Sequence, residues 1–281
     1  MDAMRKKALL IAGGDLRMLY AARQLCAEFD VRLLGFCPEQ LPPDVESLRE
    51  IIEKTVETCG KPVERADILL LPPVTADAQG KIPAPLGECS LDPETVLSQA
   101  EPGGLVLLGN DRTGRVRQLC AEKKLNWKDY INSDALAQAN AVPTAEGALK
   151  IALEETGRTI WGSRVLVTGC GRIGTILTAR LHALGAQVTA AARRESDRVR
   201  METMGVRSAA IPLDSRGLSE YDVIFNTVPA EIFQETHLCA LRADSPLIEL
   251  ASAPGGADES AVKRSGCRYV RASGLPRYVP C

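Results

Sequence analysis

Three glycines, Gly169, Gly171 and Gly174, have the G-x-G-x-x-G spacing that can hold the diphosphate of a dinucleotide. An apolar run at 164–168 precedes them, a helical pattern follows, and a second apolar run covers 187–192. In such a unit the first glycine permits a tight turn, the second lets the diphosphate approach the backbone, and the third lets helix and strand pack closely. The residues expected at the diphosphate, beside the amino end of the helix, are Gly169, Gly171, Arg172, Ile173 and Gly174.

The end of the second apolar run bears on which dinucleotide would bind. NAD-binding domains carry an acidic residue there that accepts hydrogen bonds from the ribose 2′-hydroxyl, whereas this sequence has Arg193 and Arg194. A guanidinium can form two hydrogen bonds with a 2′-phosphate and can stack on adenine. The sequence therefore favours NADP(H) over NAD(H). The alternative, that both arginines are ordinary solvated charges, stays open.

Two further turns follow apolar runs in the same half of the chain. The run 221–226 leads into Asn226, Thr227, Val228 and Pro229, and the run 247–251 leads into the turn 252–256. Ligands of open α/β sheets bind outside the carboxyl ends of the strands, so both turns are candidates for the nicotinamide ribose and ring. Their residue types are also common in turns that bind nothing.

No residue stands out as the catalytic acid or base. The two histidines, His182 and His237, fall in helical patterns, where a helix surface or partial burial is the expected setting. Dehydrogenases of hydroxy acids use a histidine beside an arginine, and that set has no clear counterpart here. The nine cysteines are scattered singly without a CxxC pair, so neither a metal site nor disulfides are expected.

The first half of the chain repeats the strand–turn–helix pattern. The apolar run 8–12 ends in a Gly-Gly-Asp turn, and the runs 31–36, 68–72 and 105–110 are typical of parallel strands buried on both faces. The Pro- and Gly-rich segment 74–102 is expected to loop along the domain edge.

These elements predict an α/β protein of two domains. A flavodoxin- or Rossmann-like βα domain covers 1–139, a connector helix covers 140–160, and a Rossmann dinucleotide-binding domain covers 161–281. Pro143 suits the start of the connector helix.

A carboxylate-binding site is expected where the first domain meets the connector. Arg17 follows the Gly-Gly-Asp turn, and its guanidinium could pair a carboxylate bidentately. Thr144 and Glu146 would lie beside free amides at the start of the connector helix. A small dicarboxylate would then lie between the two domains, opposite the nicotinamide. Alternatively, Arg17 pairs with Asp15 and Thr144 is only a helix cap.

Composition excludes several classes of partner. The chain has 281 residues, 45% of them hydrophobic, and a formal net charge of −2, so it has no overall field for nucleic acid. No apolar run is long enough for a membrane span, and the first 15 residues do not read as a signal peptide. A cytoplasmic protein with a small-molecule partner is expected; the sequence is compatible with a homo-oligomer without indicating one.

Blocks spread over nearly the whole chain resemble the A subunit of dipicolinate synthases. They are GGDLR at 13–17, NAVPTAEGALKIAL at 140–153, VLVTGCGRIG at 165–174, AARR at 191–194, FNTVP at 225–229, and LASAPGG and SGLP within 250–276. The resemblance implies oxidation of a dihydrodipicolinate, formed from the lysine-pathway intermediate 4-hydroxy-tetrahydrodipicolinate, to dipicolinate with NADP⁺ in sporulating bacteria. It also implies a second, flavoprotein-like partner, the B subunit.

One segment departs from that family. Where the family continues through GLPG and an APKTAG-like stretch into a C-terminal helix, this chain reads GLPRYVPC at 274–281. A truncated second domain, with consequences for domain closure and activity, is therefore expected. The other functions left open are an NADP-dependent dehydrogenase of another small acid, of the shikimate or 2-hydroxyacid type, and a non-catalytic nucleotide-sensing subunit.

Overall fold

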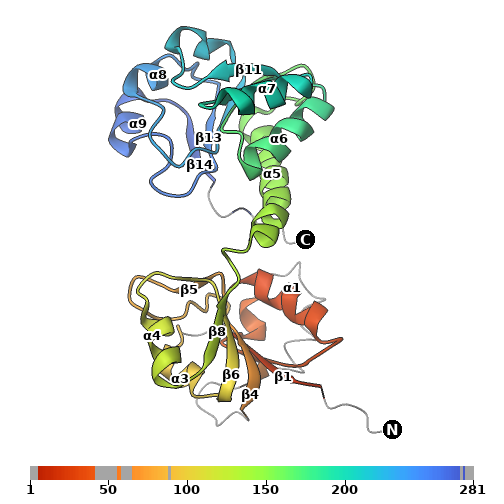
Figure 1. The fold of residues 1–281 in the computed structure, drawn as a ribbon. Helices are drawn as coiled ribbons and strands as arrows, with labels where there is room; N and C mark the ends of the chain where they lie inside the picture. The colour runs from red at the N-terminus through yellow and green to blue at the C-terminus, as the bar shows by residue number, and fades with distance from the viewer. Residues whose placement is uncertain (1–5, 42–55, 58–64, 88–89, 273–274, 276–281) are drawn as a thin grey trace. The chain divides into compact units, whose positions relative to one another are not determined.

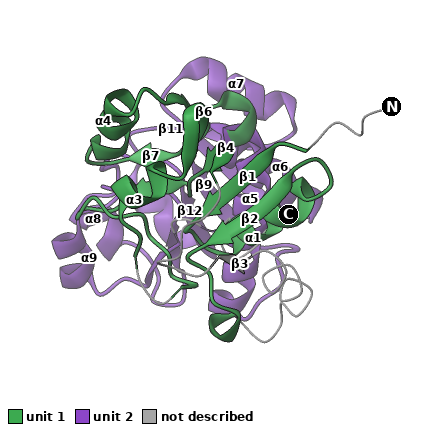
Figure 2. Cartoon of the chain, turned by 90° about the horizontal axis from the view of Figure 1, so that it is seen from below, with its two compact units in different colours: residues 1–136, 280 green, residues 137–279, 281 purple. Residues whose placement is uncertain are grey.

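The computed structural model describes residues 6–41, 56–57, 65–87, 90–272 and 275 (Figure 1). The chain forms two compact units, unit 1 from Met1 to Leu136 and unit 2 from Ala137 to Val279 (Figure 2). Each unit contains a six-stranded sheet whose recorded strand pairs are all parallel. The predicted two-domain α/β class is confirmed.

Unit 1 has the strand order β3-β2-β1-β4-β6-β8. Its strands are β1 (Ala8–Ala12), β2 (Asp30–Leu34), β3 (Val56–Glu57), β4 (Ala66–Leu70), β6 (Ala100–Leu108) and β8 (Asn126–Asp129), with a separate pair β5 (Val74–Ala76) and β7 (Asn110–Asp111). Its described helices are α1 (Leu16–Leu25), α3 (Pro93–Leu97), α4 (Arg115–Glu122) and the short 3-10 turn η1 (Pro38–Gln40).

Strand β1 shows why this half folds as a covered parallel sheet. All five of its residues are buried. Successive side chains point to opposite faces, so Leu9 and Ile11 pack in the cluster that contains Leu19 of α1, whereas Leu10 packs in another with Val106. Both faces are thereby covered, as the continuous apolar run predicts. The predicted loop 74–102 was wrong in part, since it contains β5, α3 and the start of β6.

Unit 2 has the strand order β11-β10-β9-β12-β13-β14, which is the order of the dinucleotide-binding Rossmann sheet. Its strands are β9 (Arg164–Thr168), β10 (Gln187–Ala192), β11 (Arg207–Ala210), β12 (Val223–Asn226), β13 (Leu247–Glu249) and β14 (Tyr269–Arg271). Its described helices are α6 (Arg172–Ala183), α7 (Glu195–Thr203), η2 (Ser215–Glu220), α8 (Glu235–Cys239), α9 (Glu259–Ser265) and most of the long helix α5 (Asp134–Thr156).

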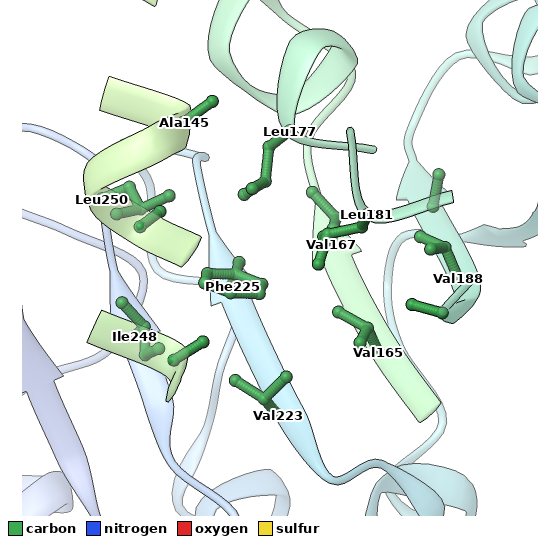
Figure 3. Close-up of a cluster of buried hydrophobic side chains, with 14 of the residues drawn as sticks. Ala145, Val165, Val167, Leu177, Leu181, Val188, Val223, Phe225, Ile248 and Leu250 are labelled. Carbon is green, nitrogen blue, oxygen red and sulfur yellow. The ribbon is translucent and has the colours of Figure 1, made fainter. Parts of the chain in front are cut away.

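The core of unit 2 holds the central strands beneath two helices. Val167 of β9 and Phe225 of β12 are fully buried and lie beside Leu177 of α6 (Figure 3). Ala145 of the long helix α5 (Asp134–Thr156) belongs to the same cluster. This packing sets the carboxyl ends of β9 and β12 side by side, where the turns after these strands begin.

Helix α5 begins six residues before the predicted connector helix, 140–160, and nine residues before Pro143, which suited its start. Its first residue is Asp134, and Pro143 and Thr144 lie inside it. The boundary between the compact units, Leu136 to Ala137, also falls within this helix. The divergent segment 274–281 lies outside the described residues, apart from Leu275.

Candidate functional site

The glycine turn after β9 has the geometry that each glycine predicts. Gly169 has a φ of +94°, and a Cβ there would collide with Oγ1 of Thr227. A Cβ on Gly174 would collide with the carbonyl oxygen of Gly169, so this glycine brings α6 close to the turn. A Cβ on Gly171 would meet no atom of the described chain within 4 Å. The space in front of Gly171 is therefore open to a ligand.

Two cavities flank this turn and share Gly171, Arg172 and Pro229. The larger has a volume of about 680 Å³ and lies toward β10 and α7. The smaller, about 360 Å³, lies toward the turns after β12 and β13. The larger is lined by residues including Gly169, Cys170, Thr175, Arg193, Arg194, Asp197, Arg200 and Val228. The smaller is lined by residues including Ile173, Thr227, Leu250, Ala251 and Ser252. The glycine turn thus has a cavity on each side, an arrangement that suits a ligand with two different ends.

Arg193 and Arg194 follow β10 directly and line the larger cavity with exposed side chains. Across the described part of unit 2, no carboxylate forms an ion pair with either guanidinium. The backbone beside them is held by Arg198, whose Nη1 donates to the carbonyls of Ala192 and Arg193, both at 3.1 Å. The cavity thus presents two cationic groups on a fixed loop.

Arg200 of α7 links the helix to the glycine turn. Its Nη2 donates to the carbonyl of Cys170 at 2.7 Å and pairs with Asp197 at 3.1 Å. Burial raises the pKa of the Cys170 thiol, the charge of Asp197 adds to this, and Arg200 opposes it. A thiol with a raised pKa is a poor nucleophile at neutral pH, so Cys170 belongs to the wall of the cavity.

The turn 226–229 divides into a buried and an exposed part. Asn226 is fully buried, and its amide is engaged by Thr168, Val228 and Glu249. Asn226 itself lines neither of the two cavities, so its place among the cofactor-binding residues stays a prediction. Thr227 lines the smaller cavity, Val228 the larger and Pro229 both.

Neither histidine lies at the cavities. His182 is in the last turn of α6. His237 is buried in a capping box at the start of α8, where Nδ1 accepts from the Gln234 N–H at 3.0 Å, and Nε2 is 3.1 Å from the Leu213 carbonyl oxygen. Both ring nitrogens of His237 thus have structural partners.

In unit 1, the turn after β1 places Arg17 and Asp15 against each other. Nε and Nη2 of Arg17 donate to the two carboxylate oxygens of Asp15 at 2.9 and 2.8 Å. Tyr130, after β8, donates its hydroxyl to the carbonyl of Leu71 at 2.8 Å. Burial raises the pKa of Tyr130, the charge of Arg17 opposes that shift, and Asp15 and Asp129 add to it. The ion pair that was the alternative for Arg17 is present, with both side chains about a quarter exposed.

Thr144 and Glu146 lie inside α5, away from its amino end. The Thr144 hydroxyl donates to the Asn140 carbonyl at 2.7 Å, and Glu146 pairs with Arg180 of α6 at 3.0 Å. Their predicted setting beside free helix amides is wrong, because amides in the middle of a helix are already paired with carbonyls four residues earlier.

Sequence reasoning missed Arg200 and Glu249. Arg200 belongs to a polar helix with no distinctive spacing, and Glu249 looks like an ordinary strand end. The described residues contain no cluster of His, Cys, Asp and Glu suited to a metal ion. None of the helices in the described ranges has the length and apolar character required to span a bilayer.

Comparisons with known proteins agree with this division of the chain. Residues 8–131 match the N-terminal domain of the dipicolinate synthase A subunit. Residues 131–258 match the NAD-binding domain of D-isomer specific 2-hydroxyacid dehydrogenases. The dipicolinate synthase A subunit of Bacillus subtilis (strain 168) is 28% identical over 96% of this chain and 89% of its own length.

Solved structures extend the similarity to three dimensions. The dipicolinate synthase A subunit of Bacillus halodurans has a TM-score of 0.83 at 28% identity, over 99% of this chain and 93% of that one. Its counterpart from Bacillus subtilis has a TM-score of 0.78 at 25% identity, over 99% and 91%. A transhydrogenase from Sinorhizobium meliloti, 16% identical with a TM-score of 0.66 over 97% and 88%, shares the fold.

The resemblance to the dipicolinate synthase A subunit, predicted from sequence blocks, is confirmed over nearly the whole chain. Unit 2 has the Rossmann strand order and matches a dehydrogenase NAD-binding domain over residues 131–258, which supports a nicotinamide dinucleotide as its cofactor. These similarities support an oxidoreductase.

Proposed function

We propose that this protein oxidises a dihydrodipicolinate, formed from 4-hydroxy-tetrahydrodipicolinate, to dipicolinate with NADP⁺. The observation that carries the proposal is the reach of the resemblance. Similarity to the dipicolinate synthase A subunit runs through both units, whereas the match to 2-hydroxyacid dehydrogenases covers only residues 131–258. The first unit is therefore what separates this chain from general dehydrogenases.

The proposed reaction is balanced as dihydrodipicolinate plus NADP⁺ giving dipicolinate, NADPH and a proton. The bound NADP⁺ supplies the hydride acceptor. The amides at the start of α6 and the open face of Gly171 are suited to hold its diphosphate. The substrate ring becomes aromatic, so positioning can supply much of the catalysis. A chain whose two histidines lie away from the cavities fits that requirement.

Arg193 and Arg194 support NADP⁺ over NAD⁺. Both side chains are exposed in the larger cavity at the end of β10, the position where NAD-preferring domains place an acid. A doubly charged 2′-phosphate there would meet two cationic groups, whereas the acid that accepts from a 2′-hydroxyl in NAD-preferring domains is replaced by arginine at this strand end. Arg198 holds the preceding carbonyls, so the loop is ordered before the ligand arrives.

The proposal extends to substrate contacts and partner. We propose that the Arg17 guanidinium binds one carboxylate of the substrate. On binding, this carboxylate would replace Asp15 as the partner of Arg17, or Arg17 would pair with both. A flavoprotein-like B subunit is the proposed partner, because the similar proteins are named as one subunit of a synthase. Sporulation is the proposed setting.

The test incubates the full chain with enzymatically generated 4-hydroxy-tetrahydrodipicolinate and NADP⁺, with and without the flavoprotein-like partner. Dipicolinate absorbance and NADPH formation are followed together, and both should rise in equal amounts. A Gly171→Val variant serves as the control without cofactor binding. Hydride transfer to NADP⁺ from another small acid, without dipicolinate, would identify a different dehydrogenase; cofactor binding without any hydride transfer would identify a nucleotide-sensing protein.

One observation favours a 2-hydroxyacid dehydrogenase as the second candidate, namely the match of residues 131–258 to that NAD-binding domain. The positions of the two histidines, away from both cavities, argue against this second function. Hydroxy-acid oxidation needs a base to accept the hydroxyl proton, and His237 has structural partners at both ring nitrogens. A panel of 2-hydroxyacids with NADP⁺ and NAD⁺ would separate the two.

A further inference from the structure

Strand β13 ends in a carboxylate that is entirely buried. Glu249 has no exposed surface, and both of its oxygens accept hydrogen bonds from Nδ2 of Asn226, at 2.8 and 3.0 Å. The Ala251 N–H donates to Oε1 at 2.9 Å and the Gly256 N–H to Oε2 at 2.7 Å. The Tyr269 hydroxyl adds a contact at 3.3 Å. Burying a charged group is costly unless such bonds replace water, so this cluster is a specific construction.

Apart from Tyr269 of β14, the donors around Glu249 belong to the two loops that line the smaller cavity. Through Asn226 it reaches the turn after β12, because Asn226 also bonds the carbonyl and N–H of Val228 at 2.9 and 3.1 Å. Glu249 also accepts hydrogen bonds from the N–H groups of Ala251 and Gly256, near the two ends of the loop 250–256. The first three residues of this loop line the smaller cavity. One side chain therefore ties together both loops on this side of the glycine turn.

Close packing leaves this network little freedom. A Cβ on Gly256 would collide with the Asn226 amide, and the Thr168 hydroxyl donates to Oδ1 of Asn226 at 2.6 Å. Thr168, Asn226 and Glu249 are all fully buried. Loss of a hydrogen bond inside such a network leaves a buried donor without a partner, which displaces the loops to which that donor belongs.

We propose that Glu249 is a positioning residue that holds the loops 226–229 and 250–256 against the nicotinamide end of the bound dinucleotide. This rests on the proposed function, in which the arginines of the larger cavity hold the 2′-phosphate and Gly171 faces the diphosphate. The remaining end of the ligand then enters the smaller cavity, across the point where the strand order reverses. Glu249 acts through the loops and contacts no ligand itself.

The test compares two ligands in the full chain by calorimetric titration. One is NADP⁺, and the other is 2′-phospho-ADP-ribose, which has the adenine, 2′-phosphate and diphosphate but no nicotinamide. In Glu249→Gln one carboxylate oxygen becomes an NH₂ group, which would face an N–H donor of Asn226, Ala251 or Gly256. Affinity for NADP⁺ should fall about tenfold, whereas affinity for the fragment should change less than about twofold.

Thr168→Val is the second variant, because it is nearly isosteric and removes the short hydroxyl bond to Oδ1 of Asn226 together with a longer one, 3.3 Å, to the Phe225 carbonyl. Its affinity for NADP⁺ should also fall selectively, but by less than in Glu249→Gln. This variant keeps the test decisive if Glu249→Gln does not fold. Glu259→Gln is the matched control: Glu259 is exposed in α9 and pairs with Arg271, so both affinities should be unchanged.

Equal losses for both ligands in the folded variants, or no loss for either, would overturn the positioning role. The proposed function fails separately, since it requires that the wild-type chain bind NADP⁺ at all. If the wild type binds NADP⁺ and the variants lose no affinity for it selectively, only the proposed role of Glu249 is contradicted.

Discussion

Different residues of unit 2 are expected to contact the two ends of the proposed dinucleotide. Arg193 and Arg194 lie in the larger cavity, Thr227 and Ser252 in the smaller, and Gly171 contributes to both. Because each contributes a different type of contact, substitutions at these positions should have effects that can be told apart by ligand choice.

Arg193→Asp should reverse the preference between NADP⁺ and NAD⁺. The loss of a charge-assisted contact with the 2′-phosphate is worth about 1.5–3 kcal/mol, or roughly ten- to a hundredfold in NADP⁺ affinity, and the new carboxylate can accept from a 2′-hydroxyl. Titration with both dinucleotides measures it. Arg207→Asp, on exposed β11, is the control that should leave the preference intact. An unchanged preference in Arg193→Asp would remove Arg193 from the proposed site.

Gly171→Val should abolish dinucleotide binding while the fold persists. The backbone there is ordinary, with a φ of −76°, and no protein atom lies within 4 Å of the added Cβ, so the valine would occupy only ligand space. Gly174→Val, in contrast, should unfold the turn, because its side chain meets the Gly169 carbonyl. Calorimetry with NADP⁺ and circular dichroism distinguish the two. Retained binding in Gly171→Val would show that this glycine serves the turn alone.

At the scale of elements, a side chain just before β12 links that strand to the start of β9. Asp222 precedes β12, and its carboxylate accepts from the N–H of Arg164, the first residue of β9, at 2.8 Å. Arg158 and Arg242 pair with the same carboxylate at 3.3 and 3.0 Å. Burial acts to raise the pKa of Asp222, but the Arg164 amide and Arg242 together bring it below the ordinary value.

Asp222→Asn should destabilise the protein at neutral pH by about 1–2 kcal/mol. A carboxyl group whose pKa is lowered by folding stabilises the protein above its unfolded-state pKa, and this contribution is lost as the pH falls through the folded-state pKa. The difference in Tm between variant and wild type should therefore be constant near neutrality and shrink below about pH 4. Thermal unfolding across that range measures it.

Asp244→Asn is the matched control for this element. Asp244 pairs with the same two arginines but is largely exposed, so its removal should change the Tm little. A pH-independent difference for Asp222→Asn would show that the asparagine acts through packing and that the charge of Asp222 contributes nothing.

At the scale of the whole molecule, two units with Rossmann-type strand order carry different turns after their first strands. When the strands of each six-stranded sheet are numbered along the chain and the separate pair β5–β7 is left out, both sheets have the order 3-2-1-4-5-6. In unit 1, however, the Gly14 N–H donates to the carbonyl of Pro83 at 2.7 Å, and a Cβ on Gly13 would lie 2.7 Å from that oxygen. The glycine turn of unit 1 is therefore packed against the chain at Pro83, whereas the turn of unit 2 borders two cavities.

Arg17→Met should affect substrate and leave the cofactor alone, because Arg17 and the glycine turn belong to different units. We expect the KM for the dihydrodipicolinate to rise, or kcat/KM to fall, by at least about tenfold, which corresponds to roughly 1.4 kcal/mol. The Kd for NADP⁺ should not change. Steady-state kinetics and calorimetry on the same preparation measure both.

Arg23→Met, in the last turn of α1, is the control for the loss of a guanidinium from the same helix. Normal turnover of Arg17→Met, or a loss of NADP⁺ binding alone, would mean that the substrate is held by other groups.

Much of this protein is determined by its sequence alone, because the signals are local. Buried parallel strands read as continuous apolar runs, and β1, β2, β4 and β9 lie within a few residues of their predicted positions. The roles of Gly169 and Gly174 follow from backbone geometry within one turn. Fold class, the division into two halves and the resemblance to the dipicolinate synthase A subunit could all be predicted in this way.

The tertiary structure decided what depends on residues distant in sequence. The sequence places Asn226 in a turn at a strand end, but only the structure pairs its amide with Glu249, 23 residues later, in a fully buried site. Pro143 suggested a helix start, but α5 begins at Asp134 and runs on through it. Nothing in the sequence indicates what packs against the Gly13–Gly14 turn, which the structure shows to be Pro83, nearly 70 residues on. Which polar groups are satisfied by the chain and which face a cavity is a property of packing between segments, and no local pattern contains it.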